Sequence, residues 1–161
     1  MIKSKNIELT EFGKNLLDID SLNDGLAYIS LNAKSMTEAD RCSIFIYKED
    51  ELWTTLADGT EKIIIPYDMG IVGETIRGRK PILENTPYDN QNFLSNIDME
   101  TGYYTQSLLT SPIFNSRREV IGVIQLLNKE NGFNKKDMEF LSFFAHYVSS
   151  FIELKSDIFI I

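Results

Sequence analysis

The chain has 161 residues, 43% of them hydrophobic and 11% aromatic, so a single domain with a sizeable packed core is expected. The formal net charge is −8, which argues against nucleic acid and anionic membrane surfaces as partners. The single cysteine, Cys42, allows neither an intramolecular disulfide nor a cysteine-based zinc cluster. No apolar run approaches the roughly 20 residues of a membrane span. Together these features favour a cytoplasmic domain with no direct membrane contact.

Two helices are predicted before the first strand. Apolar residues close to helical spacing in residues 3–19 indicate a lead-in helix, which we assign to residues 1–20. Residues 21–39 carry an apolar stripe, and Ser21 with Asp24 three positions on is a weak capping pattern. The domain proper is therefore expected to begin at residue 21 with a helix that covers the core.

Three strands are predicted next. Residues 41–57 give two strands around a turn at Lys48–Asp50, and Asp58–Gly59 forms a second turn before a short apolar strand in residues 62–66. Gly70 and Gly73 then bracket the entry to a short helix that should end near Gly78. Such an entry leaves backbone N–H groups free to face an anion, but a plain glycine-containing turn is about equally favoured by the spacing.

A lid is predicted between residues 66 and 105. Residues 81–83 form a short strand, and residues 84–97 form a long polar loop of a kind that is often functional or mobile. Asp98, Thr101 and Thr105 are spaced to share one face of a short helix, where they would offer a carboxylate and two hydroxyls to a polar ligand. The alternative is that Asp98 caps the helix and the threonines lie on the surface.

The most informative stretch is a pair of apolar runs, SLLTSPIF and EVIGVIQLLNK, joined by the polar tetrad NSRR. The pair predicts an antiparallel hairpin in a core sheet. A final helix follows in residues 134–155, with Asn134 as its cap and Asp137 three residues on. This helix is apolar on more than one face, so it needs two partners, of which one is the sheet and the other is expected to be the same helix of a second copy.

The C-terminus, ELKSDIFII, ends on apolar residues and lacks a helix stop signal, so residues 156–161 are expected to begin a linker to a further domain. Catalytic candidates are few. His146, the only histidine, lies in the apolar final helix, and Cys42 begins a strand, so both are interpreted as structural. No pair of carboxylates is supported as an acid and base by spacing alone, and we expect no catalysis by this segment and no metal or haem.

At this point the sequence resembles a known family. The motifs TGYYTQSLLTSPIF and VIGVIQLLNK, followed by Phe133 and Asp137, resemble the GAF domains of cyclic-nucleotide phosphodiesterases and adenylyl cyclases over roughly residues 22–154. The resemblance implies an α+β, GAF/PAS-like fold: a central antiparallel sheet of about six strands, terminal helices together on one face and a ligand-pocket lid on the other. The domain would occupy residues 21–155.

The resemblance also implies a ligand, cyclic AMP or cyclic GMP, buried between the sheet and the lid. Ser43 and Asp58 match positions near the base, and the backbone of Ile71 and Val72 matches the turn that holds the cyclic phosphate. The remaining matches are the lid motif of Asp98, Thr101 and Thr105, the strand position of Gln125, and a structural signature of Asn128, Lys129, Phe133 and Asp137 that includes a Lys-to-Asp ion pair.

Four residues depart from the family pattern: Ala57 replaces a stacking aromatic, Val72 a small alanine, and Gln125 and Met138 two glutamates. Two hypotheses therefore stay open. The first is a homodimeric domain that senses a small molecule and controls a covalently linked phosphodiesterase, cyclase or kinase. The second is a ligand-free dimerisation or interaction module whose pocket is filled by its own side chains.

Overall fold

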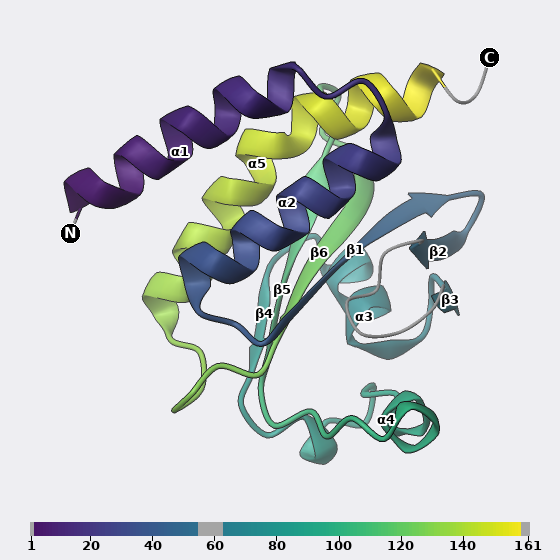
Figure 1. The fold of residues 1–161 in the computed structure, drawn as a ribbon. Coiled ribbons are helices and arrows are strands. Elements are labelled where there is room, and N and C mark those ends of the chain that lie inside the picture. Colours follow the sequence, from purple (N-terminus) through teal and green to yellow (C-terminus); the bar gives the residue numbers. More distant parts are fainter. Residues whose placement is uncertain (1, 55–62, 159–161) are drawn as a thin grey trace.

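A single antiparallel sheet organises the computed structural model, which describes residues 2–54 and 63–158 (Figure 1). Its six strands run in the order β3-β2-β1-β6-β5-β4. The strands are β1 Arg41–Lys48, β2 Glu51–Thr54, β3 Ile63–Pro66, β4 Ile82–Glu84, β5 Leu108–Phe114 and β6 Val120–Leu127. The predicted antiparallel sheet of about six strands is confirmed.

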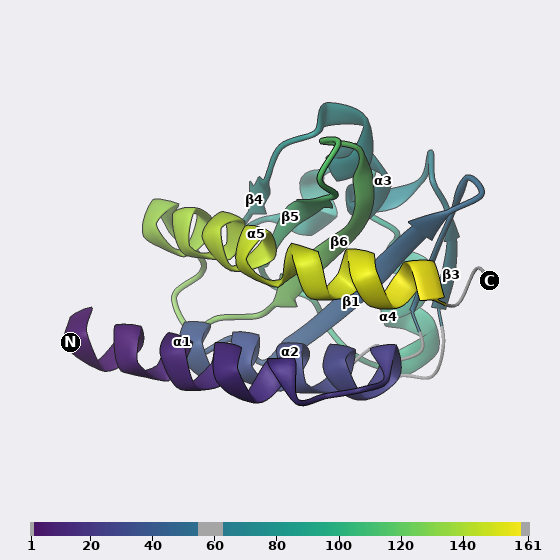
Figure 2. The ribbon, with the colours of Figure 1, turned by 90° about the horizontal axis from the view of Figure 1, so that it is seen from above.

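The helices divide between the two faces of this sheet, as the sequence predicted. They are α1 Ile2–Leu17, α2 Leu22–Thr37, α3 Gly70–Gly78, α4 Ser95–Thr101 and α5 Lys135–Ile158, with a short 3-10 turn η1 at Pro87–Asp89. Figures 1 and 2 show α1, α2 and α5 on one face, and α3 and α4 on the other. We call the first the helix face and the second the lid face. None of the described helices combines the length and apolar content needed to cross a bilayer.

The central hairpin forms where the polar tetrad predicts it. The Asn115 side-chain oxygen accepts hydrogen bonds from the amides of Arg117 and Glu119, each at 2.9 Å, and Arg118 adopts the left-handed conformation with φ 63°. An Asn at the start of such a turn satisfies backbone donors that the reversing chain exposes. Strands β5 and β6 then continue as near-unbroken apolar runs because elements cover both faces of the sheet.

The larger core lies on the helix face. Alternate residues of β1, namely Cys42, Ile44 and Ile46, pack there with residues of α2 and α5. The expected caps are present: the Ser21 side chain accepts from the Asp24 amide at 3.0 Å, and Asn134 and Asp137 exchange hydrogen bonds between side chains and amides at 2.9 Å. Reciprocal capping fixes where α5 begins.

A further partner of α5 lies within the same chain, and contact with a second copy stays a prediction. Phe12 of α1 is buried and contacts Tyr28 of α2 and Phe144 of α5, with ring centroids 5.1 and 5.2 Å apart. The Tyr147 hydroxyl donates to the Leu9 carbonyl at 3.1 Å. Thus α1 and α2 cover much of the apolar surface that the sequence assigned to a second copy. Helix α5 also continues to Ile158, so residues 156–158, expected to begin a linker, are helical.

Candidate functional site

A row of polar side chains crosses the lid face of the sheet. Ser43 of β1 lies opposite Gln125 of β6, and Gln125 lies opposite Thr110 of β5. Their strand neighbours on either side, such as Ile124 and Leu126, belong to the helix-face core, so alternation directs this row to the lid face. Ser43 and Thr110 are buried and Gln125 is half-buried. Their neutral hydroxyl and amide groups suit hydrogen bonding rather than proton transfer.

The start of α3 faces the same side. Its first residue, Gly70, has φ 76°, and the preceding Met69 contributes no side-chain cap. The amides of Ile71 and Val72 therefore receive no acceptor from the cap residue, although the two side chains are buried. A Cβ on Gly73 would lie 2.6 Å from the Tyr67 carbonyl oxygen, so this close approach of backbone to helix requires glycine.

A buried pair of threonines fixes α3 to the sheet. The Thr75 and Thr110 hydroxyl oxygens are 2.6 Å apart, and Thr75 also donates to the Ile71 carbonyl at 2.8 Å. Because the single hydroxyl proton of Thr75 is used in that bond, Thr110 donates to Thr75. The pair holds the α3 entry over the polar row. Sequence reasoning missed both residues, since a contact across 35 positions leaves no local signal.

The lid rests on α3. Asn92 donates to the Glu74 carboxylate at 2.6 Å, and Leu94 lies so close to Gly70 that a Cβ there would be 3.1 Å from a Leu94 methyl carbon. Ile97 and Leu94 also pack against the small lid-face cluster that contains Val72. The lid and the α3 entry are thus in direct contact.

The predicted arrangement of Asp98, Thr101 and Thr105 on one helix face is wrong. Helix α4 ends at Thr101, and Gly102 turns the chain with φ 75°. Thr105 lies beyond that turn and reaches back to Asp98, donating from its amide at 2.7 Å and its hydroxyl at 2.9 Å. Asp98 is not the cap of α4 either, because Leu94 occupies that position. A carboxylate and a hydroxyl expected to meet a ligand are bonded to each other.

Tyr88 completes this arrangement. Its hydroxyl donates to Asp98 at 2.6 Å, and this hydrogen bond is the main cause that raises the pKa of Tyr88 to about 12, with desolvation second. Its ring stacks on Tyr104 with centroids 5.1 Å apart. We refer to Tyr88, Asp98 and Thr105 as the lid latch, because they join three separate parts of the lid.

Asn128, a signature residue, fastens the chain between the lid and β5. It adopts φ 59°, and its side-chain oxygen accepts from the amides of Gln106 at 2.6 Å and Ser107 at 3.1 Å. Its side-chain nitrogen donates to the Tyr104 carbonyl and the Tyr103 hydroxyl, both at 2.9 Å. These four bonds hold the segment that follows the lid latch.

Tyr103 in turn contacts β1. Its hydroxyl donates to Asp40 at 2.6 Å, and the Arg41 guanidinium lies 3.6 Å from its ring centroid. Burial, followed by the bond to Asp40, raises the pKa of Tyr103 well above its usual value. The lid is therefore attached to the first strand as well as to α3.

The other signature residues lie away from the polar row. Lys129 pairs with Asp137 at 2.7 Å, with the side chains 22% and 12% exposed, and Asp137 also caps α5. Phe133 is buried, and its backbone exchanges two hydrogen bonds with the Asn85 side chain at 3.0 Å. This group joins β6, α5 and the segment after β4, which is a supporting position.

Two predicted ligand contacts fall outside what the structure describes: Asp58, and the side chain of Thr101. Ser43, Gln125 and the amides of Ile71 and Val72 are brought to the lid face, whereas Asp98 and Thr105 are held in the lid latch. Cys42 is fully buried in the helix-face core, and His146 is exposed on α5.

Comparison with known proteins agrees with this geometry. The model of the GAF domain family matches residues 22–152. A cGMP-specific 3',5'-cyclic phosphodiesterase of Drosophila ananassae is 34% identical over 89% of this chain, and the chain spans 14% of that protein.

Solved structures show the same fold. The GAF domain of a phosphoenolpyruvate-protein phosphotransferase from Coxiella burnetii has a TM-score of 0.84 at 17% identity, covering 95% of each chain. The free methionine-R-sulfoxide reductase of Neisseria meningitidis has a TM-score of 0.74 at 16% identity, covering 92% of this chain and 88% of the reductase. Proteins with unlike functions share this fold, so function must be argued from the site.

Proposed function

The chain belongs to the GAF domain family, and we propose that it is a regulatory domain that senses a cyclic purine nucleotide, cyclic AMP or cyclic GMP, between its sheet and its lid. The observation that carries the proposal is the polar row of Ser43, Gln125 and Thr110 beneath the uncapped entry of α3. A relative named as a cGMP-specific phosphodiesterase supports this ligand class.

The two parts of the site suit the two parts of such a ligand. A cyclic phosphate carries one negative charge, and the amides of Ile71 and Val72 at the positive end of α3 would donate hydrogen bonds to it. A purine edge offers both donors and acceptors, which the Ser43 hydroxyl and the Gln125 amide complement. Because both side chains can donate and accept, they do not by themselves select adenine or guanine. The net charge of −8 is compatible, since only one ligand charge must be held locally.

The lid latch is assigned a positioning role in this proposal. Asp98 already accepts three hydrogen bonds, from Tyr88 and twice from Thr105, so its lone pairs are largely used within the protein. It would hold the lid over the ligand rather than bind the ligand. We therefore expect Asp98 variants to speed ligand dissociation more than they slow association.

Calorimetric titration of cyclic AMP and cyclic GMP tests the ligand. Gln125→Ala and Ser43→Ala should each weaken binding by about fivefold to tenfold, as expected for the loss of one hydrogen bond worth roughly 1 kcal/mol. Ser35→Ala, at an exposed position of α2 on the opposite face, is the matched control and should bind like the wild type. Absence of heat up to millimolar nucleotide, or unchanged binding by both site variants, would contradict the proposal.

The second candidate is a ligand-free dimerisation module, and a specific observation favours dimerisation itself. Apolar side chains remain exposed along α1 and α5 after the chain has folded: Leu17 is 85% exposed, Leu154 62% and Phe143 50%. Such residues on neighbouring helices suit a symmetric contact with a second copy. We propose a homodimer through this surface.

Sedimentation at micromolar concentration tests the dimer. Phe143→Glu combined with Leu154→Glu should give monomers, whereas Leu31→Glu, at an exposed apolar position of α2, should not. Phe151 is unsuitable for this test, because its ring fills the space above Gly25 inside the domain. A dimer that persists in the double variant would place the contact elsewhere. A dimer that binds neither nucleotide would favour the interaction module.

The longer proteins to which this domain is related suggest its setting. The chain spans 14% of the phosphodiesterase it matches, so we propose that it is joined to an output domain that it controls. We also propose a cytoplasmic location. Helix α5, which runs to Ile158 on the helix face, is the element best placed to transmit a change to that domain.

A further inference from the structure

Positive charge gathers at one end of the sheet, away from the proposed nucleotide site. The C-terminal end of α3 and the turn between β5 and β6 meet there and present four exposed basic side chains, which we call the basic patch: Arg79, Lys80, Arg117 and Arg118. These are four of the chain's 16 Lys and Arg residues, whereas only one of its 24 acidic residues, Glu119, lies in the two segments 78–80 and 115–119. The remainder of the domain is correspondingly more acidic.

The two halves of the basic patch are fixed to each other. The Arg79 guanidinium donates to the Arg118 carbonyl at 2.6 Å, and both guanidinium groups lie over the Phe114 ring, at 5.1 and 5.9 Å from its centroid. Stacking on an aromatic ring holds a guanidinium while leaving its N–H groups directed outward. The charges are thus held close together although like charges repel.

Backbone conformation marks the same two residues. Arg79 has φ 56° and Arg118 has φ 63°. This left-handed region favours Gly and Asn, and an Arg there carries a conformational cost. The surroundings fix both conformations, because Arg79 is the C-cap of α3 and Arg118 lies in the turn between β5 and β6.

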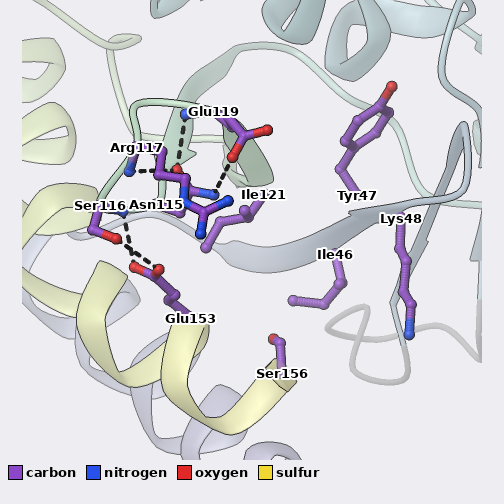
Figure 3. Close-up of a pocket in the computed structure, with 10 residues that line it drawn as sticks. All are labelled: Ile46, Tyr47, Lys48, Asn115, Ser116, Arg117, Glu119, Ile121, Glu153 and Ser156. Carbon is purple, nitrogen blue, oxygen red and sulfur yellow. Dashed lines mark hydrogen bonds between the residues drawn. The ribbon is translucent and has the colours of Figure 1, made fainter. Parts of the chain in front are cut away.

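A cavity of about 400 Å³ adjoins the patch at Arg117 (Figure 3). Ile46 and Ile121 give it apolar walls, and Arg117 and Lys48 stand on opposite sides of it in this view. The two acids that line it are engaged: Glu153 accepts from the Ser116 amide and hydroxyl, both at 2.9 Å, and Glu119 accepts from Asn115 at 3.1 Å. The lining holds two basic and two acidic side chains besides its apolar walls, so the cavity suits an apolar side chain, and the basic patch beside it is what favours acidic flanks.

We propose that the basic patch and the adjoining cavity bind an acidic polypeptide segment, with one apolar side chain of the segment in the cavity. Guanidinium groups pair with carboxylates through two parallel hydrogen bonds, which favours this ligand chemistry. At physiological salt, charges more than about 8 Å apart are largely screened from each other. A short segment bound at the patch therefore interacts with the basic side chains there and little with the acidic surface elsewhere. A membrane surface or a nucleic acid extends farther and would meet the acidic remainder of the domain.

A labelled peptide in which glutamates flank one phenylalanine tests the proposal by fluorescence anisotropy. The variant Arg117→Glu with Arg118→Glu should bind it at least about tenfold more weakly than the wild type, because two attractive contacts become repulsive. The matched control is Lys135→Glu with Lys136→Glu, which makes the same change in net charge at exposed positions at the start of α5. Circular dichroism checks that each protein folds. If the double glutamate variant does not fold, Arg117→Gln with Arg118→Gln replaces it.

Binding that is lost in the patch variant, kept in the control and weakened by salt supports the proposal. Equal loss in both variants shows a general effect of net charge and overturns it, as does unchanged binding in both. Vesicles containing phosphatidylserine and a single-stranded RNA are tested alongside. If either binds the patch as tightly as the peptide, the patch takes polyanions generally and the assignment to a polypeptide segment is wrong.

Discussion

Thr105 donates two hydrogen bonds to the carboxylate of Asp98, one from its amide at 2.7 Å and one from its hydroxyl at 2.9 Å. The two residues lie on opposite sides of the turn at Gly102, and Tyr88 adds a third bond to the same carboxylate. One buried acid therefore fixes the path of the chain from the lid into β5. Any ligand that used Asp98 directly would have to open this connection first.

Thr105→Val should lower the free energy of unfolding by roughly 1 to 3 kcal/mol, because it keeps the shape of a buried residue and removes one bond to a charged acceptor. Thr105→Ser keeps the hydroxyl and should lose less. Urea denaturation of the three proteins measures the difference. Equal losses in the two variants would show that packing of the methyl group, and not the hydroxyl, is what matters.

The raised pKa of Tyr88 predicts that the stability of the domain depends on pH in the alkaline range. Its pKa is raised to about 12 from the ordinary 10.0, so the folded state favours the protonated phenol. Stability from this group is fully present below pH 10 and is lost as the pH rises through about 12. The difference in unfolding free energy between the wild type and Tyr88→Phe should accordingly shrink over that interval. A difference that stays constant from pH 9 to pH 12 would contradict the assignment.

Local patterns predicted the elements well, and the reason is visible in particular residues. The run EVIGVIQLLNK became β6 because its two faces are both covered, and Ser21 and Asn134 begin α2 and α5 as the capping patterns indicated. Even the end of α4 was readable, since Gly102 stands directly after Thr101 and a glycine there commonly ends a helix. The helical spacing of Asp98 and Thr105 indicates one continuous helix face, but the left-handed Gly102 between them ends the helix.

The sequence pattern did not predict contacts between segments that lie far apart in the chain. The pairing of Thr75 with Thr110 depends on how α3 lies across the sheet, and the packing of Phe12 against Phe144 depends on α1 folding back over α5. A helical stripe shows that a face is covered but not which element covers it. For the same reason the apolar stripe of α5 did not show that α1 of the same chain packs against it.

Removing Lys129 should destabilise the domain less than removing Asp137, because Asp137 both pairs with Lys129 and caps α5. Lys129→Ala removes a partly exposed pair and should lower the free energy of unfolding by about 1 to 2 kcal/mol, between the values for surface and buried pairs. Asp137→Ala also removes the acceptor of the Asn134 amide and should cost roughly 1 kcal/mol more. Lys136→Ala, at an exposed neighbour, is the control. Thermal and urea unfolding check the order, and equal effects of the first two variants would contradict it.

Replacing glycine with alanine should have opposite effects at Gly122 and at Gly78, because a new Cβ meets different surroundings at the two positions. A Cβ on Gly122 would lie 2.6 Å from the Phe45 carbonyl oxygen, and the two paired strands cannot move apart without breaking their ladder, so Gly122→Ala should be strongly destabilising. At Gly78 the nearest atom to a new Cβ is the Lys80 side chain at 3.7 Å. Gly78→Ala should be neutral or stabilise by up to about 1 kcal/mol. Melting temperatures of the two variants decide this, and a tolerated Gly122→Ala would show that the strands can separate.

Asn128 permits the sharpest test of how the lid is joined to the sheet. Asn128→Asp keeps the acceptor that faces the amides of Gln106 and Ser107 but replaces the donor that faces the Tyr104 carbonyl with a second oxygen. It should lower the free energy of unfolding by roughly 1 to 3 kcal/mol while those two amides stay protected from hydrogen exchange. Asn128→Gly relieves the left-handed backbone but removes every side-chain bond, so the same two amides should exchange faster even where global stability changes little. Exchange measured residue by residue separates the two effects. Protection of Gln106 and Ser107 that is equal in the two variants would mean that other contacts, and not Asn128, hold the segment between the lid and β5.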